Sequence, residues 1–501
     1  MYMVNFTKKF FLKNLKIIDY ISLFLILYLI FQNILGLLNQ LDYRHLHIDE
    51  RQLIDSILNV YQLNDEFGRF DSINSETLRN TLVVISELVI GGNLDYGRLY
   101  TNIFIIAAGP LYYLGFESLL IASRIIQMII MIYTLIYISK YFINSQFRFI
   151  FVLFSLSMPG AYYLIQNPKP DPLVLLLIFV GIKKISVDNK TKSSFIYLGM
   201  SVGVKIIAII PVFIFILFLF IFEKKFTSLK ETLNLFIYFC FGLAISQPAL
   251  LIPSPQIYSR IISALKVGSV YDQDKFLKMD FNNFSIWFKT LSDELDLSVS
   301  IFYIILLLGC LSLIKSVWSR GDYLDIYMLL TFLVFLLFIT LNIQRIWNYY
   351  LTIPFIFLLI YLFFKKKNIT KLKMILLIFA FILSISGFIA HNDKAVNSYF
   401  QVDINMEQSF SEAVLFLEEN YSNRPMKYNL VYWDPDLYFP RYEIDYNEKF
   451  KVLENWEYDQ NYLPLYSKVD FIVSLRQIEL TIGITEKKFG DTFVYYLDKS
   501  S

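Results

Sequence analysis

The sequence predicts a mainly α-helical protein that crosses a membrane many times and ends in a small α/β domain. Of the 501 residues, 56% are apolar and only 18% are charged, and the mean hydropathy is +0.51. These values lie outside the usual range for soluble globular proteins. Long apolar runs separated by basic clusters fill the first 390 residues, and the remainder reads as a polar, strand-rich segment. The fold class is therefore a polytopic membrane bundle with an appended domain.

The expected membrane spans follow from the length of the apolar runs, because a spanning helix needs about 20 mostly apolar residues. Two other stretches, 79–92 with Glu87 and 100–115 with a Gly-Pro break, could be interfacial or partly inserted helices. Residues 194–222 are too long for one span, and "GMSVGVK" suggests a short helix that turns into a longer one. We expect about 11 to 13 spans in total. The clear candidates are residues 17–38, 122–139, 148–166, 172–186, 206–222, 232–252, 299–315, 324–343, 346–364 and 374–390.

Basic residues predict which connections lie inside, because short cytoplasmic loops are enriched in Lys and Arg. The transmembrane domain, residues 1–390, then has its first outer loop at about 40–121 and another at about 253–298. Residues 167–171 and 344–345 also lie outside, as does everything after 391. The inside segments are the basic ones at 8–16, 140–148, 183–192, 224–230, 315–320 and 365–373.

The segment 391–501 differs in charge and pattern. It holds 11 Lys and Arg against 19 Asp and Glu, a net charge of −8, and since the whole chain carries +2, the first 390 residues carry +10. "NMEQSFSEAVLFLEENYS" has helical spacing, and "YNLVYW", "KVDFIVSL" and "TFVYYLD" are typical of short strands. We expect an acidic, water-soluble α/β domain on the extracytoplasmic face.

Unusual polar clusters all fall on the predicted outer side. Ionisable groups at span ends that face a common cavity indicate a functional site. Each cluster also has a structural interpretation: carboxylates favour a helix start, a Lys or Arg at a span end often reaches to headgroups, and the histidines could be solvated. Convergence on one face favours function. The clusters are "HIDE" with His47, Asp49 and Glu50, "NPKPDPL" with Lys169 and Asp171, and "QRIWNYY" with Arg345.

This set of residues suits group transfer from a phosphate-linked lipid. A carboxylate near an acceptor hydroxyl can accept its proton as the new bond forms. Cations aimed at the departing phosphate stabilise its developing charge, and the arginine fork can hold two oxygens at once.

The motifs resemble those of the GT-C membrane glycosyltransferases, the group that includes protein O-mannosyltransferases and bacterial aminoarabinose transferases. "HIDE" is similar to the acidic pair of their first outer loop, and "AAGPLYYLG" to a following Pro-Leu-Tyr-Tyr-like segment, although the usual double proline is missing. Arg124 stands where an arginine opens the next span, and "KPDPL", "GMSVGVK" and "RIWNYYLTIP" follow in order. The resemblance covers roughly residues 15–365.

The resemblance implies an inverting transfer of a sugar from an isoprenoid-phosphate donor to an acceptor hydroxyl outside the cell membrane. Asp49 and Glu50 would be catalytic, with Asp49 as the base, and a divalent metal could be held by His47 and Asp49. The acceptor could be a lipid-linked glycan, a cell-wall polymer or a protein, and no nucleic acid is expected. Donor-phosphate binding would fall to Arg345, Lys169, Asp171 and Arg124.

Two other classes of membrane protein stay open as alternatives. A lipid-glycan transporter should show inverted repeats and helices interrupted near the bilayer midplane, and no such symmetry is visible. An O-antigen-type polymerase or ligase is favoured only by the long loop 253–298. Cys240 and Cys310 each lie within an apolar run, which excludes a disulfide framework or a thiolate zinc site.

Overall fold

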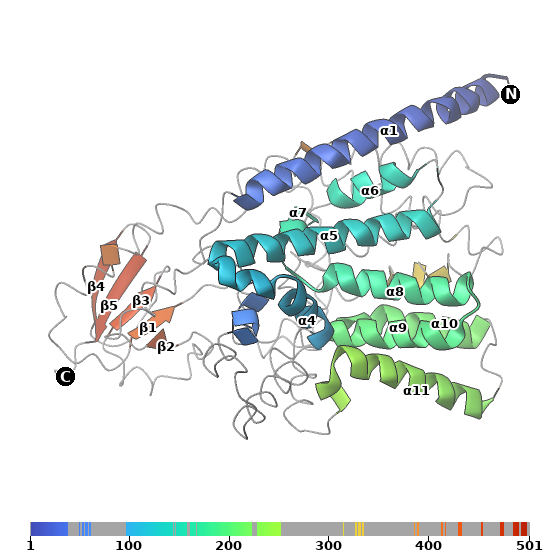
Figure 1. Cartoon of the computed structure of the whole chain (residues 1–501). Helices are drawn as coiled ribbons and strands as arrows, with labels where there is room; N and C mark the ends of the chain where they lie inside the picture. The colour runs from blue at the N-terminus through green and yellow to red at the C-terminus, as the bar shows by residue number, and fades with distance from the viewer. Residues whose placement is uncertain are drawn as a thin grey trace. The chain divides into compact units, whose positions relative to one another are not determined.

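The computed structural model of the chain describes two compact units, each considered by itself (Figure 1). One consists of Met1–Asn39 with Asp49–Asn397 and is helical where it is described; the other consists of Gln40–Ile48 with Ser398–Ser501 and contains the sheet. The described residues are 2–38, parts of 50–61, 97–251 apart from 144, 146, 158–160, 167 and 223–227, short pieces within 314–334, 385–389 and 412–416, and five strands between 429 and 497.

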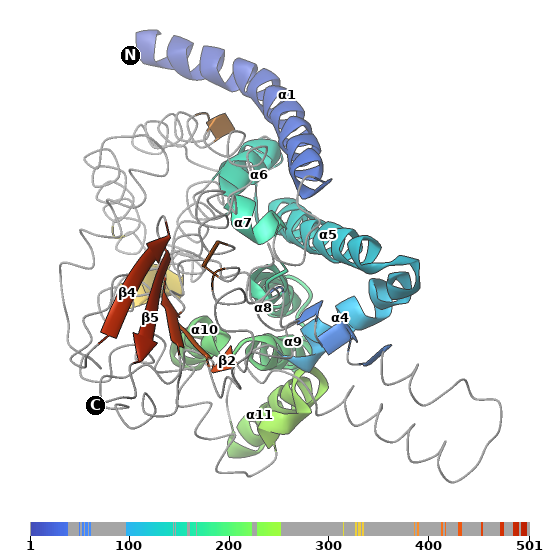
Figure 2. The ribbon, with the colours of Figure 1, turned by 90° about the vertical axis from the view of Figure 1, so that its left-hand side faces the viewer.

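The helical unit is built around α5, α8 and α9, which lie side by side with α8 in the middle (Figure 2). The helix α11 packs on the far side of α9, and α1 packs against α6. The helices are α1 (Tyr2–Leu38), α4 (Arg98–Ala107), α5 (Phe116–Phe142), α6 (Arg148–Ser157), α7 (Ala161–Gln166), α8 (Asp171–Ser186), α9 (Thr191–Val204), α10 (Ile209–Phe222) and α11 (Leu229–Ser246), with short 3-10 segments η2 (Gly109–Leu114), η3 (Ile206–Ala208) and η4 (Pro248–Leu251).

Three of the described helices are long and apolar enough to cross a membrane: Ile18–Leu37 within α1, Phe116–Phe142 and Leu229–Ser246. Large apolar side chains such as Phe24 and Phe236 are exposed on their outer surfaces. Such an apolar outer surface suits lipid rather than water. The part of the chain that is described is thus mainly helical, as expected of a membrane bundle.

Two expected elements differ from the structure in their details, and a third agrees with it. Residues 148–166 form two helices, α6 and α7, instead of one span, and the sequence between them contains Pro159 and Gly160, which disfavour a continuous helix. Residues 194–222 divide at Lys205, but α9 and α10 each have 14 residues, so neither is the longer one. The 100–115 stretch contains the ten-residue α4 followed by η2, about 15 Å of helix in α4, which is too short for a span.

Small residues allow α9 and α11 to approach closely. A Cβ added to Gly199 would collide with the carbonyl of Phe239, and one added to Gly203 would collide with the Ser246 hydroxyl. Gly242 on α11 faces the carbonyl of Ile196 in the same way. The "GMSVG" segment of α9 is therefore a small-xxx-small packing motif of the kind common between membrane helices, and it fixes the position of Lys205 directly after α9.

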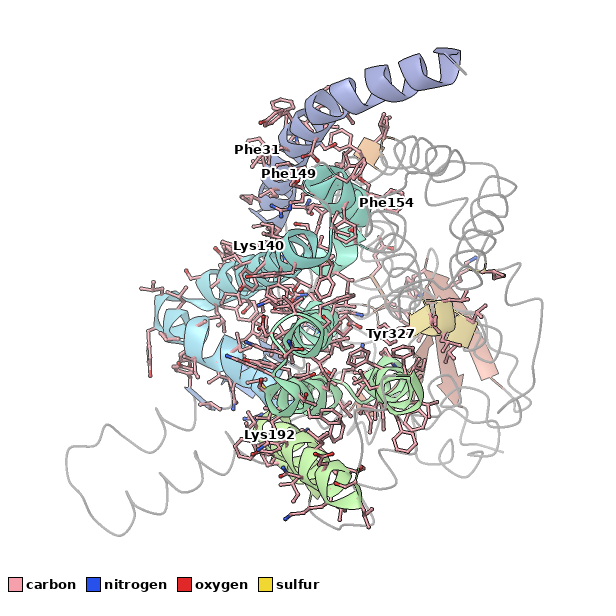
Figure 3. All side chains as sticks on the ribbon, turned by 90° about the vertical axis from the view of Figure 1, so that its right-hand side faces the viewer. Phe31, Lys140, Phe149, Phe154, Lys192 and Tyr327 are labelled. Carbon is pink, nitrogen blue, oxygen red and sulfur yellow. The ribbon has the colours of Figure 1, made fainter. Side chains whose placement is uncertain are left out.

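A carboxylate from α1 fastens that helix to the start of α6. Asp19 Oδ1 accepts hydrogen bonds from the backbone N–H groups of Phe149, at 2.9 Å, and Ile150, at 3.2 Å. These N–H groups belong to the first turn of α6 and have no partner within the helix. The two helices lie side by side in Figure 3, where Phe149 marks the beginning of α6.

The second unit contains a mixed five-stranded sheet with the order β2-β1-β3-β5-β4. Strands β1 and β2, and β1 and β3, pair in parallel, whereas β3–β5 and β4–β5 are antiparallel. Three of the strands fall within the runs "YNLVYW", "KVDFIVSL" and "TFVYYLD". The strands are β1 (Asn429–Tyr432), β2 (Val452–Leu453), β3 (Phe471–Ser474), β4 (Ile484–Phe489) and β5 (Thr492–Leu497).

Candidate active site

A buried ion pair joins α5 to the segment between α1 and α5, which we call the first loop. Arg124 Nε lies 2.7 Å from Glu50 Oε1, and Arg124 Nη2 lies 3.1 Å from Glu50 Oε2, so the guanidinium fork engages both carboxylate oxygens. The Glu50 side chain is fully buried and that of Arg124 is 4% exposed. Buried charges are tolerated only when they are paired and hydrogen-bonded. The two predicted site residues are therefore brought together, although 74 positions separate them in the sequence.

One turn further along α5, Gln127 holds the turn between α7 and α8, which we call the second loop. Its Nε2 donates to the carbonyls of Leu164, at 2.8 Å, and Lys169, at 3.0 Å. The usual helical donor to Leu164 would be the residue four positions later, which is Pro168 and has no N–H. Gln127 thus satisfies a carbonyl that the Pro-rich turn leaves without a donor, a strict requirement where water is excluded.

A tyrosine of α4 orients the Gln127 amide. Tyr100 of α4 donates its hydroxyl to Gln127 Oε1 at 3.1 Å, and both side chains are buried. Further along α5, the Thr134 hydroxyl lies 3.0 Å from the Pro172 carbonyl. Arg124, Gln127 and Thr134 therefore form a buried polar face of α5. Gln127 and Thr134 hold the turn carrying Lys169 and Asp171, and Arg124 holds Glu50.

Asp171, the first residue of α8, pairs with Lys205, which follows α9. Lys205 Nζ lies 3.0 Å from Asp171 Oδ1 and 3.1 Å from Oδ2. The Asp171 side chain is 2% exposed, whereas that of Lys205 is 23% exposed. The negative charge of Asp171 also suits the amino end of α8. This pair places a cation beside the predicted donor-phosphate residues, and Lys169 in the same turn is buried as well.

The start of α4 completes this end of the bundle. Gly97 donates its backbone N–H to Val204 at 2.8 Å, and a Cβ on Gly97 would collide with the Gly203 carbonyl. Arg98 is buried and its backbone N–H donates to Gln247 Oε1 at 3.3 Å. The first loop therefore meets the end of α9 next to Lys205.

Aromatic side chains secure another part of the first loop. The Tyr61 hydroxyl donates to the Ile105 carbonyl at 3.1 Å, and its ring lies 5.9 Å from those of Tyr112 and Tyr113 in η2. Burial raises the pKa of the Tyr61 phenol. The "PLYY" segment thus anchors the first loop, with Tyr61 donating a proton in its hydrogen bond.

The structure brings together Glu50 with Arg124, and Lys169 with Asp171. His47, Asp49 and Arg345 lie outside the described residues, so their predicted roles and the His47–Asp49 metal site stay predictions. Within the described segments no group of three or more His, Cys, Asp or Glu side chains could hold a metal ion. Sequence reasoning missed Lys205, Gln127 and Arg98 as site residues, although Lys205 ends the "GMSVGVK" motif and Gln127 is a polar residue within an expected span.

Comparisons with known proteins return one similar solved structure. No family profile and no curated protein matches the sequence. Among solved structures, the chain is similar to ArnT from Cupriavidus metallidurans in the apo state, with 9% sequence identity and a TM-score of 0.49 over 94% of this chain and 97% of that chain.

Proposed function

We propose that the protein is a membrane glycosyltransferase that moves a sugar from an isoprenoid-phosphate donor to an acceptor hydroxyl. The observation that carries this proposal is the buried polar face of α5. Its Arg124 pairs with Glu50, and its Gln127 holds the turn that carries Lys169 and Asp171. Asp171 in turn pairs with Lys205 at the end of α9, so these charged groups lie at one end of an otherwise apolar bundle. Buried ionisable groups in membrane helices are costly and mark functional pathways. Their position at one end of the helices suits a donor whose tail stays in lipid.

In this proposal the acceptor oxygen attacks the anomeric carbon while the bond from that carbon to the phosphate oxygen breaks. The hydroxyl proton passes to Asp49, and the lipid phosphate leaves with the bonding electrons, which gives an inverted glycosidic bond. Arg345 and Lys169 stabilise the charge on the departing phosphate. A divalent metal held by His47 and Asp49 would, if bound, supply a further charge at this place.

We propose that the Glu50 carboxylate positions the first loop and does not act as a second catalytic group. Because both of its oxygens are engaged by Arg124, it is poorly placed to accept another proton. We assign Glu50 and Arg124 to positioning: the pair fixes the segment in which Asp49 is the preceding residue. Asp171 acts similarly by holding Lys205 at the turn that carries Lys169.

The proposal is tested with the purified chain in detergent and radiolabelled polyprenyl-phosphate hexoses, with the products separated as lipid phosphate and glycoside. Lys169→Ala should lower the transfer rate by about 10²-fold or more, the scale for losing one preorganised charge donor. Lys192→Ala, which removes an exposed lysine at the opposite end of α9, is the matched control and should retain the wild-type rate. Movement of intact donor across a bilayer without glycoside formation would favour a transporter instead.

The sidedness of the site is tested with single cysteines in a background without Cys240 and Cys310. Leu114 is 72% exposed at the site end and Val187 is 59% exposed at the other end, so both positions should react readily. An impermeant maleimide should label Leu114→Cys in intact cells and should label Val187→Cys only after permeabilisation. Labelling of both from the same side would contradict an extracytoplasmic site.

A further inference from the structure

A strongly basic turn joins α8 to α9 at the end of the bundle away from the candidate active site. This basic turn, residues 183–192, contains four lysines and a single carboxylate, Asp188, for a net charge of +3. Lys140 in the last turn of α5 adds a further cation. Arg124 at the candidate site and Lys140 near the basic turn are 16 residues apart on α5, which corresponds to about 24 Å along the helix. Figure 3 views the bundle from this end, with Lys140 and Lys192 labelled.

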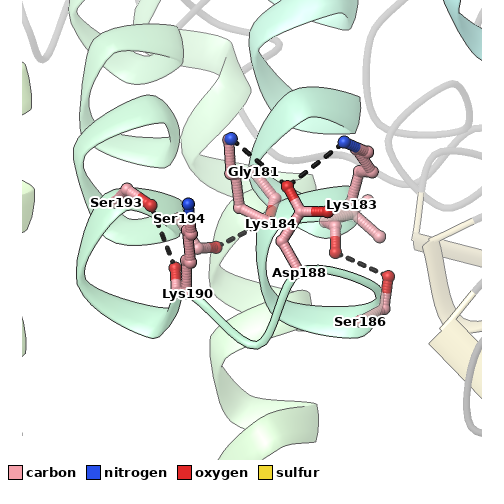
Figure 4. A network of polar contacts seen from close by, with 9 residues as sticks. Gly181, Lys183, Lys184, Ser186, Asp188, Lys190, Ser193 and Ser194 are labelled. Carbon is pink, nitrogen blue, oxygen red and sulfur yellow. Dashed lines mark hydrogen bonds and ion pairs between the residues drawn. The ribbon is translucent and has the colours of Figure 1, made fainter.

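Asp188 gathers two of the lysines at one point. Its Oδ2 lies 3.1 Å from Lys183 Nζ and 3.2 Å from Lys184 Nζ (Figure 4). All three side chains are partly exposed, by 17%, 26% and 21% for Lys183, Lys184 and Asp188. Because each ammonium has three N–H donors, both lysines keep donors for an anionic ligand. A single carboxylate therefore organises the two cations without neutralising them.

The backbone of the basic turn is held in one conformation. Lys190 donates its N–H to the Lys184 carbonyl at 2.7 Å. The Ser194 hydroxyl donates to the Gly181 carbonyl at 2.7 Å (Figure 4). Asn189 occupies the left-handed region with a φ of +53°, which asparagine tolerates better than most residues. Such preorganisation lowers the conformational cost of binding a ligand.

Tyrosines place the basic turn at the level of lipid headgroups. The Tyr141 ring lies 4.5 Å from Lys183 Nζ and 5.3 Å from Lys140 Nζ. Tyr133, Tyr137 and Tyr141 follow one another along α5, and the rings of the last two are 4.7 Å apart. Tyr133 and Tyr141 are 55% and 40% exposed. Tyrosines concentrate where a spanning helix leaves the hydrocarbon, and the candidate span α5 ends here.

A second candidate span begins at the same end. The α11 helix starts at Leu229 and packs against α9. Its Tyr238 ring lies 5.5 Å from Lys192 Nζ, a lysine of the basic turn. Two spans thus border the same group of lysines, as expected at a membrane surface.

We propose that the basic turn binds the phosphate of an anionic phospholipid headgroup in the adjoining leaflet. Phosphate oxygens accept hydrogen bonds from the ammonium groups, and the acyl chains lie along the exposed apolar face of α5. A zwitterionic lipid is a poor occupant because its own cation would face the lysines. This interaction does not depend on the transferase activity, since it lies at the opposite end of the helices.

The test uses the full chain in detergent, with native mass spectrometry to count bound phosphatidylglycerol or phosphatidylcholine. Wild-type protein should retain phosphatidylglycerol selectively, and the retention should fall with added salt. The Lys183→Gln/Lys184→Gln variant should bind phosphatidylglycerol about 10-fold or more weakly, because each lysine at a membrane surface contributes to anionic-lipid affinity. Lys487→Gln/Lys488→Gln removes two exposed lysines from β4 and should leave the affinity unchanged.

Three results would overturn the proposal. They are equal retention of both lipids by the wild type, an equal loss in the Lys487/Lys488 control, and displacement of the lipid by micromolar inorganic pyrophosphate, which would assign the turn to a soluble anion. If Lys183→Gln/Lys184→Gln does not fold, Lys190→Gln/Lys192→Gln changes two exposed side chains of the same turn. Undiminished phosphatidylglycerol binding by this folded variant would equally refute the proposal.

Discussion

Substituting only Arg124 of the buried Glu50–Arg124 pair should destabilise the protein far more than substituting both residues. Both side chains are buried and both carboxylate oxygens are engaged, so Arg124→Met leaves a buried carboxylate without its cation. Loss of one partner from a buried ion pair costs about 3–5 kcal/mol, whereas replacing both by apolar or neutral groups is often close to neutral. Glu50→Gln should cost less than Arg124→Met, because a neutral amide can still accept a hydrogen bond from the guanidinium.

The assay is reversible unfolding in mixed micelles for the wild type, both single variants and Glu50→Gln/Arg124→Met. The double variant should recover most of the stability lost in Arg124→Met, with a coupling free energy of about 2 kcal/mol or more, at the upper end for residues in contact. The partly exposed pair Lys183–Asp188 provides the matched control, for which the same cycle should show little coupling. Additive effects of the two buried substitutions would refute the burial and pairing that hold the first loop to α5.

Three further outcomes follow from single contacts. Gln127→Leu removes the donor to two carbonyls of the Pro-rich turn and should cost about 1–3 kcal/mol of stability for each buried group left unsatisfied. Hydrogen exchange in the peptide covering residues 161–175 should become faster. Unchanged exchange would contradict the role of Gln127 in holding this turn. Gly203→Val should prevent the close approach of α9 and α11 and lower the melting temperature, whereas Met200→Leu on the same helix should not. The hydrogen bond from Lys183 lowers the pKa of Asp188 below its ordinary value of 3.8. The contribution of ionised Asp188 to stability is therefore present above pH 3.8 and is lost as the pH falls through the lowered pKa. The melting temperatures of wild type and Asp188→Asn should converge in acid, and a constant difference between them would contradict this.

Much of the helical unit could be predicted from the sequence, because the length of an apolar run and the presence of Gly or Pro within it are local features. The Gly109-Pro110 break was read from the sequence, and α4 with η2 confirms that this stretch is no full span. Residues 148–166 were expected to be one span because the apolar run is long enough to cross a membrane, although it contains Pro159 and Gly160. The division of residues 194–222 into two helices was predicted, but not their equal lengths of 14 residues, which depend on packing against neighbouring helices.

The candidate site could be predicted from charge at Glu50, Lys169 and Asp171, which are ionisable groups at the ends of apolar runs. Arg124 was predicted only from the resemblance to the GT-C group. Lys205 was not predicted, because its partner Asp171 is 34 residues away and only the packing of α9 against its neighbours brings them together. Gln127 is neutral, and its importance follows from the carbonyl left without a donor by Pro168, which is visible once α5 and the turn lie side by side.

The proposed transfer chemistry is tested most directly by comparing wild-type protein with Asp49→Asn for sugar transfer and donor binding on the same purified samples. Asparagine keeps the size of aspartate and caps a helix about as well, but it lacks the basicity needed to accept the hydroxyl proton. We expect Asp49→Asn to abolish transfer from a labelled polyprenyl-phosphate hexose while donor affinity and thermal stability stay near wild-type values. Wild-type transfer by Asp49→Asn would contradict its role as the base, and absence of transfer by the wild type with every polyprenyl-phosphate hexose tried would contradict the proposed function itself.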